Sequence, residues 1–547
     1  MKKLLLIFSV LLFALNVNSQ GFIKKTIFSS NSGFPEESKF IFDYSVTGGV
    51  AYTLPITTQA YQIIEWGDGS KSKYNAANPT GRTHTYTTTG VYEIKVGGDI
   101  YTVGASGAYR EVKQWGWMSP ININFSGSGS MSITATDILD MTNETSMSSM
   151  FRDCDGITDI PNINQWDVSG VTNTSYMFFR ANNVSCDMSG MDWTSLTSVY
   201  RMFYEATSFA GDLSNWTFPA LRVMSGIFYK TYGIHSQDFS SWDVSEITKM
   251  NAVFSTCGAF NGNVTNWDVG KVTDMAVMFQ NCSSFNQDIS GWDTKNVTTM
   301  AAMFQSASSF NQYIGDWDVS KVSSMSFMFR GCGMNQPLTN WVTTALTNTS
   351  FMFRESPYNH PLNHFDVGSV TNMDSMFYAS SFNLDLDAWD VGSVTNMDSM
   401  FYLKTFTGDI STWNVSSVTN MDSMFRQGSF NGNISGWNVS SVTNMSQMFY
   451  SCGAFDQNIS SWNISNVTNM TDFMTADTSA DPCGFSTPNY DAILNAWSLL
   501  TLQPNVVANL GGQYGVKSIY TIATSQAARD VLTNAPNNWT ITDGGGI

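Results

Sequence analysis

A thirteen-residue sequence, DVGSVTNMDSMFY, occurs twice without a change, at 366–378 and 390–402, and a variant, NVSSVTNMDSMFR, follows at 414–426. Tryptophan recurs at the same period, every 23 to 27 residues, and Phe365 fills the one gap. The Trp residues are at 166, 193, 216, 242, 267, 292, 317, 341, 389, 413, 437 and 462. A second column is Phe at 151, 178, 203, 228, 254, 279, 304, 329, 353, 377, 401, 425, 449 and 473. About fourteen repeats of this period, with fixed apolar positions, predict a solenoid of stacked coils.

The apolar pattern changes within each repeat. In 382–406, the segment LDLDAWDV alternates apolar and polar residues, which predicts a short, half-buried strand. The next segment, SVTNMDSMF, places Val, Met, Met and Phe at offsets 0, 3, 6 and 7, which predicts a short helical turn. Thr395, followed three residues later by Asp398, has the pattern of a helix-capping box. We therefore expect a short strand and a short helical turn in each coil.

The repeat consensus VTNMxxMFxxCxxFNxDISxWDVS resembles the surface-protein repeats of bacterial BspA-like leucine-rich-repeat proteins, and the resemblance covers residues 141–476. It implies a leucine-rich-repeat-like solenoid that is displayed at or beyond the cell surface. Members of that family are regarded as adhesins or interaction scaffolds, so the resemblance also implies a binding role.

The segments outside the repeats differ from them in character. Residues 1–19 contain two lysines and then the apolar run LLLIFSVLLFAL, which is typical of a signal peptide. In 20–103, EWGDGS and HTYTTTGVYEIKV resemble the PKD-type β-sandwich. The matching residues are Trp66, Gly67, Asp68, Gly69, His84, Tyr86, Gly90 and Tyr92. The alternative is a β-rich cap on the first coil, with 104–140 as an irregular first coil.

We expect residues 477–547 to form a helical cap that closes the stack, with helices near 489–500 and 524–535. The predicted fold class is thus a leucine-rich-repeat-like solenoid with an N-terminal all-β sandwich-like module and a C-terminal helical cap.

The composition and the absence of known motifs limit the classes of function that the chain can have. The net charge of −18 argues against a nucleic-acid partner, which would require a basic face. After removal of the signal peptide, no segment is apolar enough to span a membrane. Zinc motifs, phosphate-binding loops and nucleophile elbows are absent from the sequence, so we expect no enzyme and no cofactor.

Some residue columns allow two interpretations. Five of seven cysteines, at 154, 257, 282, 332 and 452, occupy a slot that holds Ala, Ser or Gly in other repeats, so we favour buried thiols over a Cys257–Cys282 bridge. Asp follows Trp in many repeats, but Asn replaces it in the last three, so local backbone capping is favoured over a calcium ladder. His360 and His364 flank Pro361, which disfavours a metal pair. The methionines recur at core spacing.

The column directly after the Phe column is rich in Tyr and Arg, the residue types that contribute most to protein interfaces. It consists of Arg152, Tyr204, Tyr229, Arg330, Arg354, Tyr378, Tyr402, Arg426 and Tyr450. We hypothesise that it is part of a partner-binding face. The alternative is that these long side chains only cover the apolar edges between coils.

Together these observations predict an exported, non-enzymatic binding protein, secreted or at a bacterial cell surface, that acts as an adhesin for an extracellular protein or glycan. One alternative is a structural spacer or surface-layer component. A second is the binding part of a carbohydrate-active protein.

Overall fold

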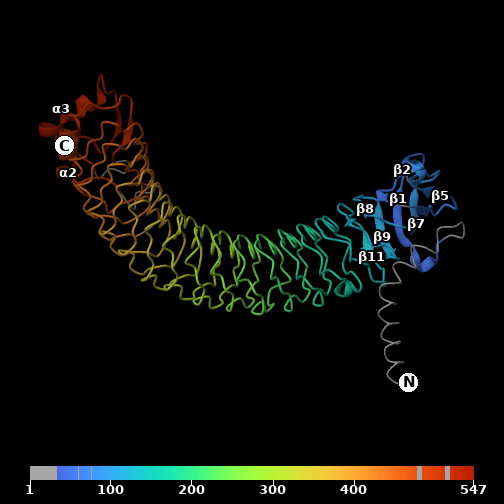
Figure 1. Ribbon diagram of the computed structural model, residues 1–547. Helices are drawn as coiled ribbons and strands as arrows, with labels where there is room; N and C mark the ends of the chain where they lie inside the picture. Colours follow the sequence, from blue (N-terminus) through green and yellow to red (C-terminus); the bar gives the residue numbers. More distant parts are fainter. Residues whose placement is uncertain (1–33, 59–60, 76, 404, 477–482, 512–517) are drawn as a thin grey trace. The chain divides into compact units, whose positions relative to one another are not determined.

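The computed structural model describes residues 34–547, except 59–60, 76, 404, 477–482 and 512–517 (Figure 1). The expected signal peptide, residues 1–19, lies outside the described residues. The chain forms two compact units. The first contains residues up to Leu196 together with Glu205–Asp212, and the second contains Thr197–Tyr204 and Leu213–Ile547.

The first unit begins with a six-stranded sheet in the order β11-β9-β1-β7-β4-β5. Its strands are β1 (Phe40–Val46), β4 (Gln62–Glu65), β5 (Lys71–Tyr74), β7 (Gly90–Gly98), β9 (Tyr109–Gln114) and β11 (Ser132–Ile133). In β1, Phe40, Phe42 and Tyr44 are buried, and their rings pack in a chain with 4.8 and 6.1 Å between centroids. The aromatic residues of β1 therefore form the centre of this sheet's core.

Smaller elements complete the N-terminal part. A three-stranded sheet has the order β10-β8-β3, and β2 pairs with β6. Their bounds are β2 (Ala51–Thr53), β3 (Ile56–Thr57), β6 (Thr83–Thr85), β8 (Thr102–Val103) and β10 (Asn122–Ile123), with 3-10 turns η1 (Glu36–Ser38), η2 (Pro79–Arg82) and η3 (Ile163–Gln165). The sheet extends past residue 103, where we expected the β module to end, because β9 pairs antiparallel with β1. Residues 104–140 are thus partly strand and not only an irregular coil.

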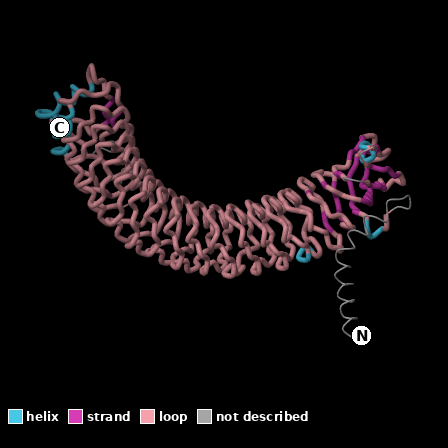
Figure 2. The backbone as a smooth tube through the Cα atoms, viewed as in Figure 1, coloured by secondary structure: helices cyan, strands magenta, loops and turns pink. Residues whose placement is uncertain are grey.

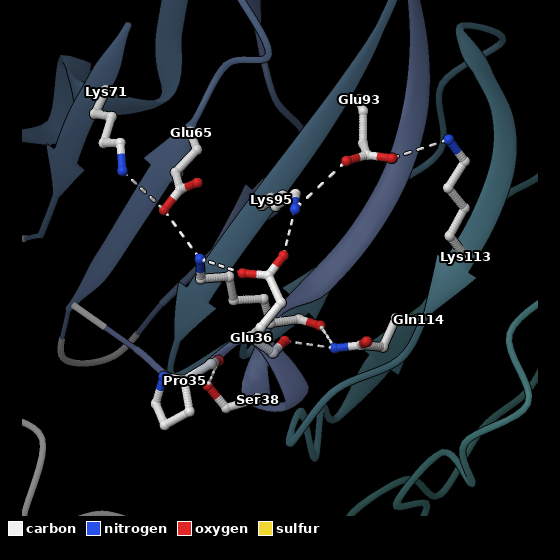
Figure 3. Close-up of polar contacts among 10 residues, drawn as sticks. Pro35, Glu36, Ser38, Glu65, Lys71, Glu93, Lys95, Lys113 and Gln114 are labelled. Carbon is white, nitrogen blue, oxygen red and sulfur yellow. Dashed lines mark hydrogen bonds and ion pairs between the residues drawn. The ribbon is translucent and has the colours of Figure 1, made fainter. Parts of the chain in front are cut away.

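A network of ion pairs joins the strands of the large sheet (Figure 3). Lys39 lies 2.8 Å from Glu36 and 3.0 Å from Glu65, and Lys95 also pairs with Glu36. Lys113 extends the network to Glu93 at 3.0 Å. Several alternating charges that share partners across strands contribute more than isolated surface pairs.

The repeats are built from turns, not from the expected strand and helix (Figure 2). Neither LDLDAWDV nor SVTNMDSMF contains a strand or a helix. Ser399 has a φ of 52°, and Met400 donates its N–H to the carbonyl of Met397, which closes a four-residue turn. A positive φ at the third position of a turn is incompatible with a continuous helix. Such turns still place every third residue on the inside, which explains why the sequence resembles a helical face.

Backbone hydrogen bonds join each coil to its neighbours. In the coil around residue 400, the N–H groups of Met397 and Ser399 donate to carbonyls of the following coil at 3.0 and 2.8 Å. Thr395 does not cap a helix, because its Oγ1 donates to the carbonyl of Thr371 in the preceding coil at 3.1 Å. The same bond recurs at Thr172, Thr248, Thr273, Thr298, Thr347, Thr419, Thr443 and Thr468. The threonine column therefore fastens one coil to the next.

Aromatic columns fill the core of the second unit. The Phe rings of neighbouring coils are stacked, as at Phe377 and Phe401, whose centroids are 5.7 Å apart. Trp rings stack in the same way, as at Trp292 and Trp317, 6.2 Å apart with planes within 3°. The indole N–H of a typical repeat donates to a carbonyl of the preceding coil, as Trp389 does to Leu362 at 2.8 Å. Each coil thus buries its apolar residues against one another, as at Phe401 and Phe406, and against the neighbouring coils.

The C-terminal part covers the last coil. It contains the helices α2 (Thr487–Trp497) and α3 (Ile522–Thr533), near the two segments predicted to be helical, and the paired strands β12 (Val507–Asn509) and β13 (Thr540–Thr542). Met470 forms a parallel bridge with Ala508, and the N–H of Asp472 donates to Asn509 Oδ1 at 3.0 Å. Strand β12 therefore takes the place of a further coil. Within the described ranges, no helix is both long and apolar enough to cross a membrane.

Candidate functional site

Five of the predicted site residues form one continuous stack in the second unit, which we call the central ladder: Arg354, Tyr378, Tyr402, Arg426 and Tyr450. The rings of Tyr378 and Tyr402 are parallel, with centroids 4.5 Å apart. The Arg354 guanidinium lies 4.0 Å from the centroid of Tyr378. The Arg426 guanidinium lies between the other two rings, 5.3 Å from Tyr402 and 4.4 Å from Tyr450. Five consecutive coils thus contribute one residue each to a half-buried stack of rings and cations.

The remaining predicted members lie elsewhere. Tyr204 and Tyr229 form a separate stacked pair in the second unit, 4.3 Å apart. Arg330, in the coil before Arg354, lies over Phe327 at 5.9 Å, outside the stack, and shares Glu355 with Arg354, at 4.0 and 3.2 Å. Arg152 belongs to the first unit, where its guanidinium lies 4.9 Å from the ring of Phe179. The structure therefore divides the predicted column into a central ladder and separate groups.

Stacking covers the faces of the ladder rings. Tyr378 has Arg354 on one face and Tyr402 on the other, and Tyr402 lies between Tyr378 and Arg426. The edges of the half-buried rings therefore face solvent, next to Leu403, which is 48% exposed. Neighbouring Trp rings of this unit are up to 6.4 Å apart, compared with 4.5 Å for Tyr378 and Tyr402. The ladder rings are thus stacked more closely than the Trp rings.

A column of carboxylates, which the sequence interpretation missed, accompanies the ladder. Asp374, Asp398 and Asp422 occupy the same position in three consecutive coils and are half-buried. Burial raises the pKa of Asp374, and the charge of Asp398 raises it further, against an opposing effect of Arg354. Burial and the charge of Asp398 likewise raise the pKa of Asp422. The sequence signal was the identical NMDSMF of these repeats, which places like charges side by side.

An asparagine ladder, also missed, runs beside these carboxylates. The Nδ2 group of each Asn donates to Oδ1 of the Asn in the preceding coil, with distances of 3.3, 3.1, 2.9 and 3.0 Å along the ladder. Its members are Asn372, Asn396, Asn420, Asn444 and Asn469. The invariant TNM of these repeats was the available signal. Asn396 Oδ1 also accepts the N–H of Asp398 at 3.2 Å, so the asparagine ladder holds the backbone at the start of the following turn.

The Asp column after Trp makes local backbone contacts. Asp390 Oδ1 accepts the N–H of Gly392 at 3.0 Å, and Asn414 Oδ1 accepts the N–H of Ser416 at 3.2 Å. Asp and Asn perform the same capping in this position, so the preferred interpretation of the column is confirmed. In the part of the chain that the structure describes, no group of three or more His, Cys, Asp or Glu residues is arranged to hold a metal ion.

The cysteines and histidines have structural contacts. All seven cysteines are buried, and Cys257 and Cys282 are free thiols whose Sγ atoms donate to the carbonyls of Phe228 and Phe254, both at 2.9 Å. Burial raises the pKa of the Cys257 thiol to about 12, which keeps it protonated and unreactive. His360 and His364 donate separately, to the carbonyls of Asn335 and Leu338.

In the first unit, the residues that resemble the PKD pattern converge. Asp68 accepts hydrogen bonds from Ser70 and lies 2.7 Å from His84 Nε2. The imidazole of His84 stacks on Trp66 at 4.9 Å, and Tyr86 donates to the Trp66 carbonyl at 3.1 Å. Burial alone would raise the pKa of Asp68, but the hydrogen bonds from Ser70 and the contact with His84 outweigh burial and lower it to about 2.

The lowered pKa of Asp68 leads to a pH prediction. A depressed folded-state pKa stabilises the fold above the unfolded value of about 3.9, and this stabilisation is lost as the pH falls through about 2. We expect Asp68→Asn to destabilise the β module by about 1 kcal/mol at neutral pH, after allowance for partial exposure, and by almost nothing near pH 2. Urea unfolding of wild type and variant, followed by circular dichroism at both pH values, measures this. A constant difference between wild type and variant would contradict the assignment.

The geometry defines a repeat protein whose coils stack through aromatic, threonine and asparagine columns. Four overlapping matches to one family model, at residues 121–237, 222–336, 328–426 and 379–482, cover more than half of the chain. The chain therefore belongs to this family, DUF285, which is described as a Mycoplasma protein of unknown function. No curated protein and no solved structure matches the chain.

Proposed function

We propose that this chain is an exported, non-enzymatic binding protein that acts as an adhesin, and that the central ladder is part of its partner-binding face. The observation that carries the proposal is the stack of Tyr378, Tyr402 and Arg426 in consecutive coils, with ring edges and Leu403 turned to solvent. Tyr and Arg dominate the energetic centres of protein interfaces. Stacking also fixes these side chains before binding, so less conformational entropy is lost when a partner docks.

The wider architecture in this proposal is a leucine-rich-repeat-like solenoid of the BspA-like kind, with a PKD-like N-terminal module, secreted or at a bacterial cell surface. A structural spacer is favoured by the other columns, since the Thr and Asn ladders are the same in coil after coil. The ladder differs from these columns, because its residue type changes between Arg and Tyr from coil to coil.

The test is an array of glycans and extracellular-matrix proteins incubated with the chain from Gln20 onward, with and without EDTA. We expect binding to one class, and we expect Tyr378→Ala with Tyr402→Ala to weaken it by about tenfold, because the solvent-facing centre of the ladder is removed. Circular dichroism should show a small change in melting temperature.

The matched controls separate recognition from packing. Tyr378→Phe with Tyr402→Phe retains the stack, and Tyr204→Ala with Tyr229→Ala removes the other stacked pair of the unit. Both control pairs should bind nearly as well as the wild type. A large loss of stability in the ladder variant, or no binding by the folded wild type, would favour the structural spacer. Loss of binding in EDTA would instead support the calcium interpretation.

A further inference from the structure

Two partly exposed phenylalanines occupy a position where most repeats of the second unit have a small or polar residue. Phe327 and Phe351 come two residues before the buried Phe of their coils, and Ser375, Ser399 and Ser423 hold the same position in the next three coils. The backbone has a positive φ at this position, 60° at both phenylalanines, and bulky side chains rarely adopt that conformation. Neither the backbone conformation nor the core therefore requires a phenylalanine here.

The two rings continue the central ladder towards the preceding coils. They are stacked, with centroids 4.4 Å apart and planes within 7°. The Arg354 guanidinium lies 5.6 Å from the centroid of Phe351 and 4.0 Å from that of Tyr378, so one cation contacts both the phenylalanine pair and the ladder. Partly exposed aromatic and arginine side chains thus run through six consecutive coils, from Phe327 to Tyr450.

Arg330, beside Phe327, has hydrogen-bond donors to spare. Its guanidinium lies 5.9 Å from the Phe327 ring, and Glu355 is 4.0 Å away, which is beyond hydrogen-bond distance. Glu355 instead accepts from Arg354 Nε at 3.2 Å, and Arg354 also acts on the charge of Asp374. Within the described part of the chain, the Arg330 side chain thus donates no hydrogen bond, although it is 33% exposed.

The arrangement of the rings suits a protein side chain better than a sugar. Sugars pack their C–H groups on an open aromatic face, where the electron density of the ring is highest. Phe327 and Phe351 each cover one face of the other, and Arg354 and Tyr402 cover the two faces of Tyr378. Phenylalanine also has no polar atom that could bond to a sugar hydroxyl. Aromatic and arginine side chains together are typical of the centres of protein–protein interfaces.

We infer that the phenylalanine pair and Arg330 select the partner, which is a protein segment that presents an aliphatic side chain next to a carboxylate. The aliphatic side chain packs on the edges of the stacked rings, and the carboxylate accepts hydrogen bonds from Arg330. This inference rests on the proposed binding role of the central ladder. The net charge of −18 opposes an acidic partner only at a distance, because salt screens charges beyond about 8 Å at physiological ionic strength.

The experiment measures fluorescence anisotropy at physiological ionic strength with the chain from Gln20 onward. The probe is a labelled nonapeptide of alternating leucine and glutamate, and two further peptides have serine in place of leucine or glutamine in place of glutamate. We expect the leucine–glutamate peptide to bind at least about tenfold more tightly than the other two.

The first variant is Phe327→Ser with Phe351→Ser, which should weaken binding of the leucine–glutamate peptide by about tenfold. Serine is the native residue at this position in the next three repeats, so the fold should be retained, and circular dichroism checks this. The matched control is Val277→Ser, at the same position in another coil, which should bind within about twofold of the wild type.

The second variant, Arg330→Gln, tests the carboxylate contact. It should remove the preference for the glutamate peptide over the glutamine peptide, while the preference for leucine over serine remains. A merely structural role of Arg330 would instead weaken both leucine peptides equally, and that result would overturn the assignment.

The remaining outcomes are also decisive. Equal binding of the leucine and serine peptides, or unchanged binding by the phenylalanine variant, would overturn the inference. Failure of all three peptides, together with Tyr378- and Tyr402-dependent binding on the array, would reject this partner and leave the proposed function intact. Failure in both experiments would reject both.

Discussion

Replacement of Trp292 by Ala should lower the free energy of unfolding of the second unit by about 4 kcal/mol. The indole is 3% exposed and lies between Trp267 and Trp317, with centroids 6.3 and 6.2 Å away. Its Nε1–H donates to the carbonyl of Val264 at 3.2 Å. The substitution removes two stacking contacts and a hydrogen bond, and neighbouring coils cannot close the gap without breaking their backbone bonds. Urea unfolding followed by circular dichroism measures the loss.

The hydrogen bond of the indole can be tested separately from the stacking, because one repeat of the chain has Phe in place of Trp and a neighbouring His as the donor. Phe365 occupies the Trp column but has no N–H, and His364 before it donates to Leu338, the carbonyl that an indole would reach. Trp292→Phe should therefore cost about 2 kcal/mol, part of it because the Val264 carbonyl loses one of its two donors and keeps only the N–H of Trp267. Gly291 precedes Trp292 and has free space where a side chain would begin.

The rescue variant is Gly291→His combined with Trp292→Phe. We expect it to recover about 1 kcal/mol of the loss, whereas Gly291→His alone should change stability little. A double variant that is no more stable than Trp292→Phe would show that the donor at this position is not important. The double variant reproduces the arrangement of His364 and Phe365, in which a histidine donates the hydrogen bond that the Phe cannot.

The sequence predicted the features that depend on one coil at a time. The Phe and Trp columns are buried as their periodicity indicated, and the cysteine slot is a buried slot for small residues. The alternation of Asp and Asn after Trp was sufficient to predict a local cap, because both side chains accept the same backbone N–H. At these positions, the residue types found across the repeats are enough to predict burial or capping.

Features that depend on pairs of coils were not predictable. Thr395 with Asp398 has the local pattern of a helix cap, yet the hydroxyl of Thr395 bonds to another coil. Nothing within one repeat shows that its Asn faces the Asn of the next, or that Tyr378 and Tyr402 stack. The Tyr and Arg column could be identified as outward-facing, but its division into a ladder and separate groups depends on which coils are neighbours.

Asn420→Ala should destabilise the second unit by about 3 kcal/mol, because three hydrogen bonds depend on this side chain. Its Nδ2 donates to Asn396 at 3.1 Å, and its Oδ1 accepts from Asn444 Nδ2 at 2.9 Å and from the N–H of Asp422 at 3.2 Å. The matched control is Asn414→Ala in the same repeat, which removes one local, exposed bond and should cost at most about 1 kcal/mol. Equal losses in the two variants would contradict the ladder.

Asn420→Asp isolates the donor of the ladder. The carboxylate can still accept from Asn444 and Asp422, but it places an oxygen against Asn396 Oδ1 and adds a charge next to the half-buried carboxylate column. We expect a loss of about 3 kcal/mol at neutral pH, and partial recovery in acid, because a protonated carboxyl can donate the missing hydrogen bond. The sign follows from a raised folded-state pKa: the penalty is present above that pKa and is relieved below it. Urea midpoints at neutral and acidic pH measure it, and a pH-independent loss would mean that the donor at this position is not what joins the coils.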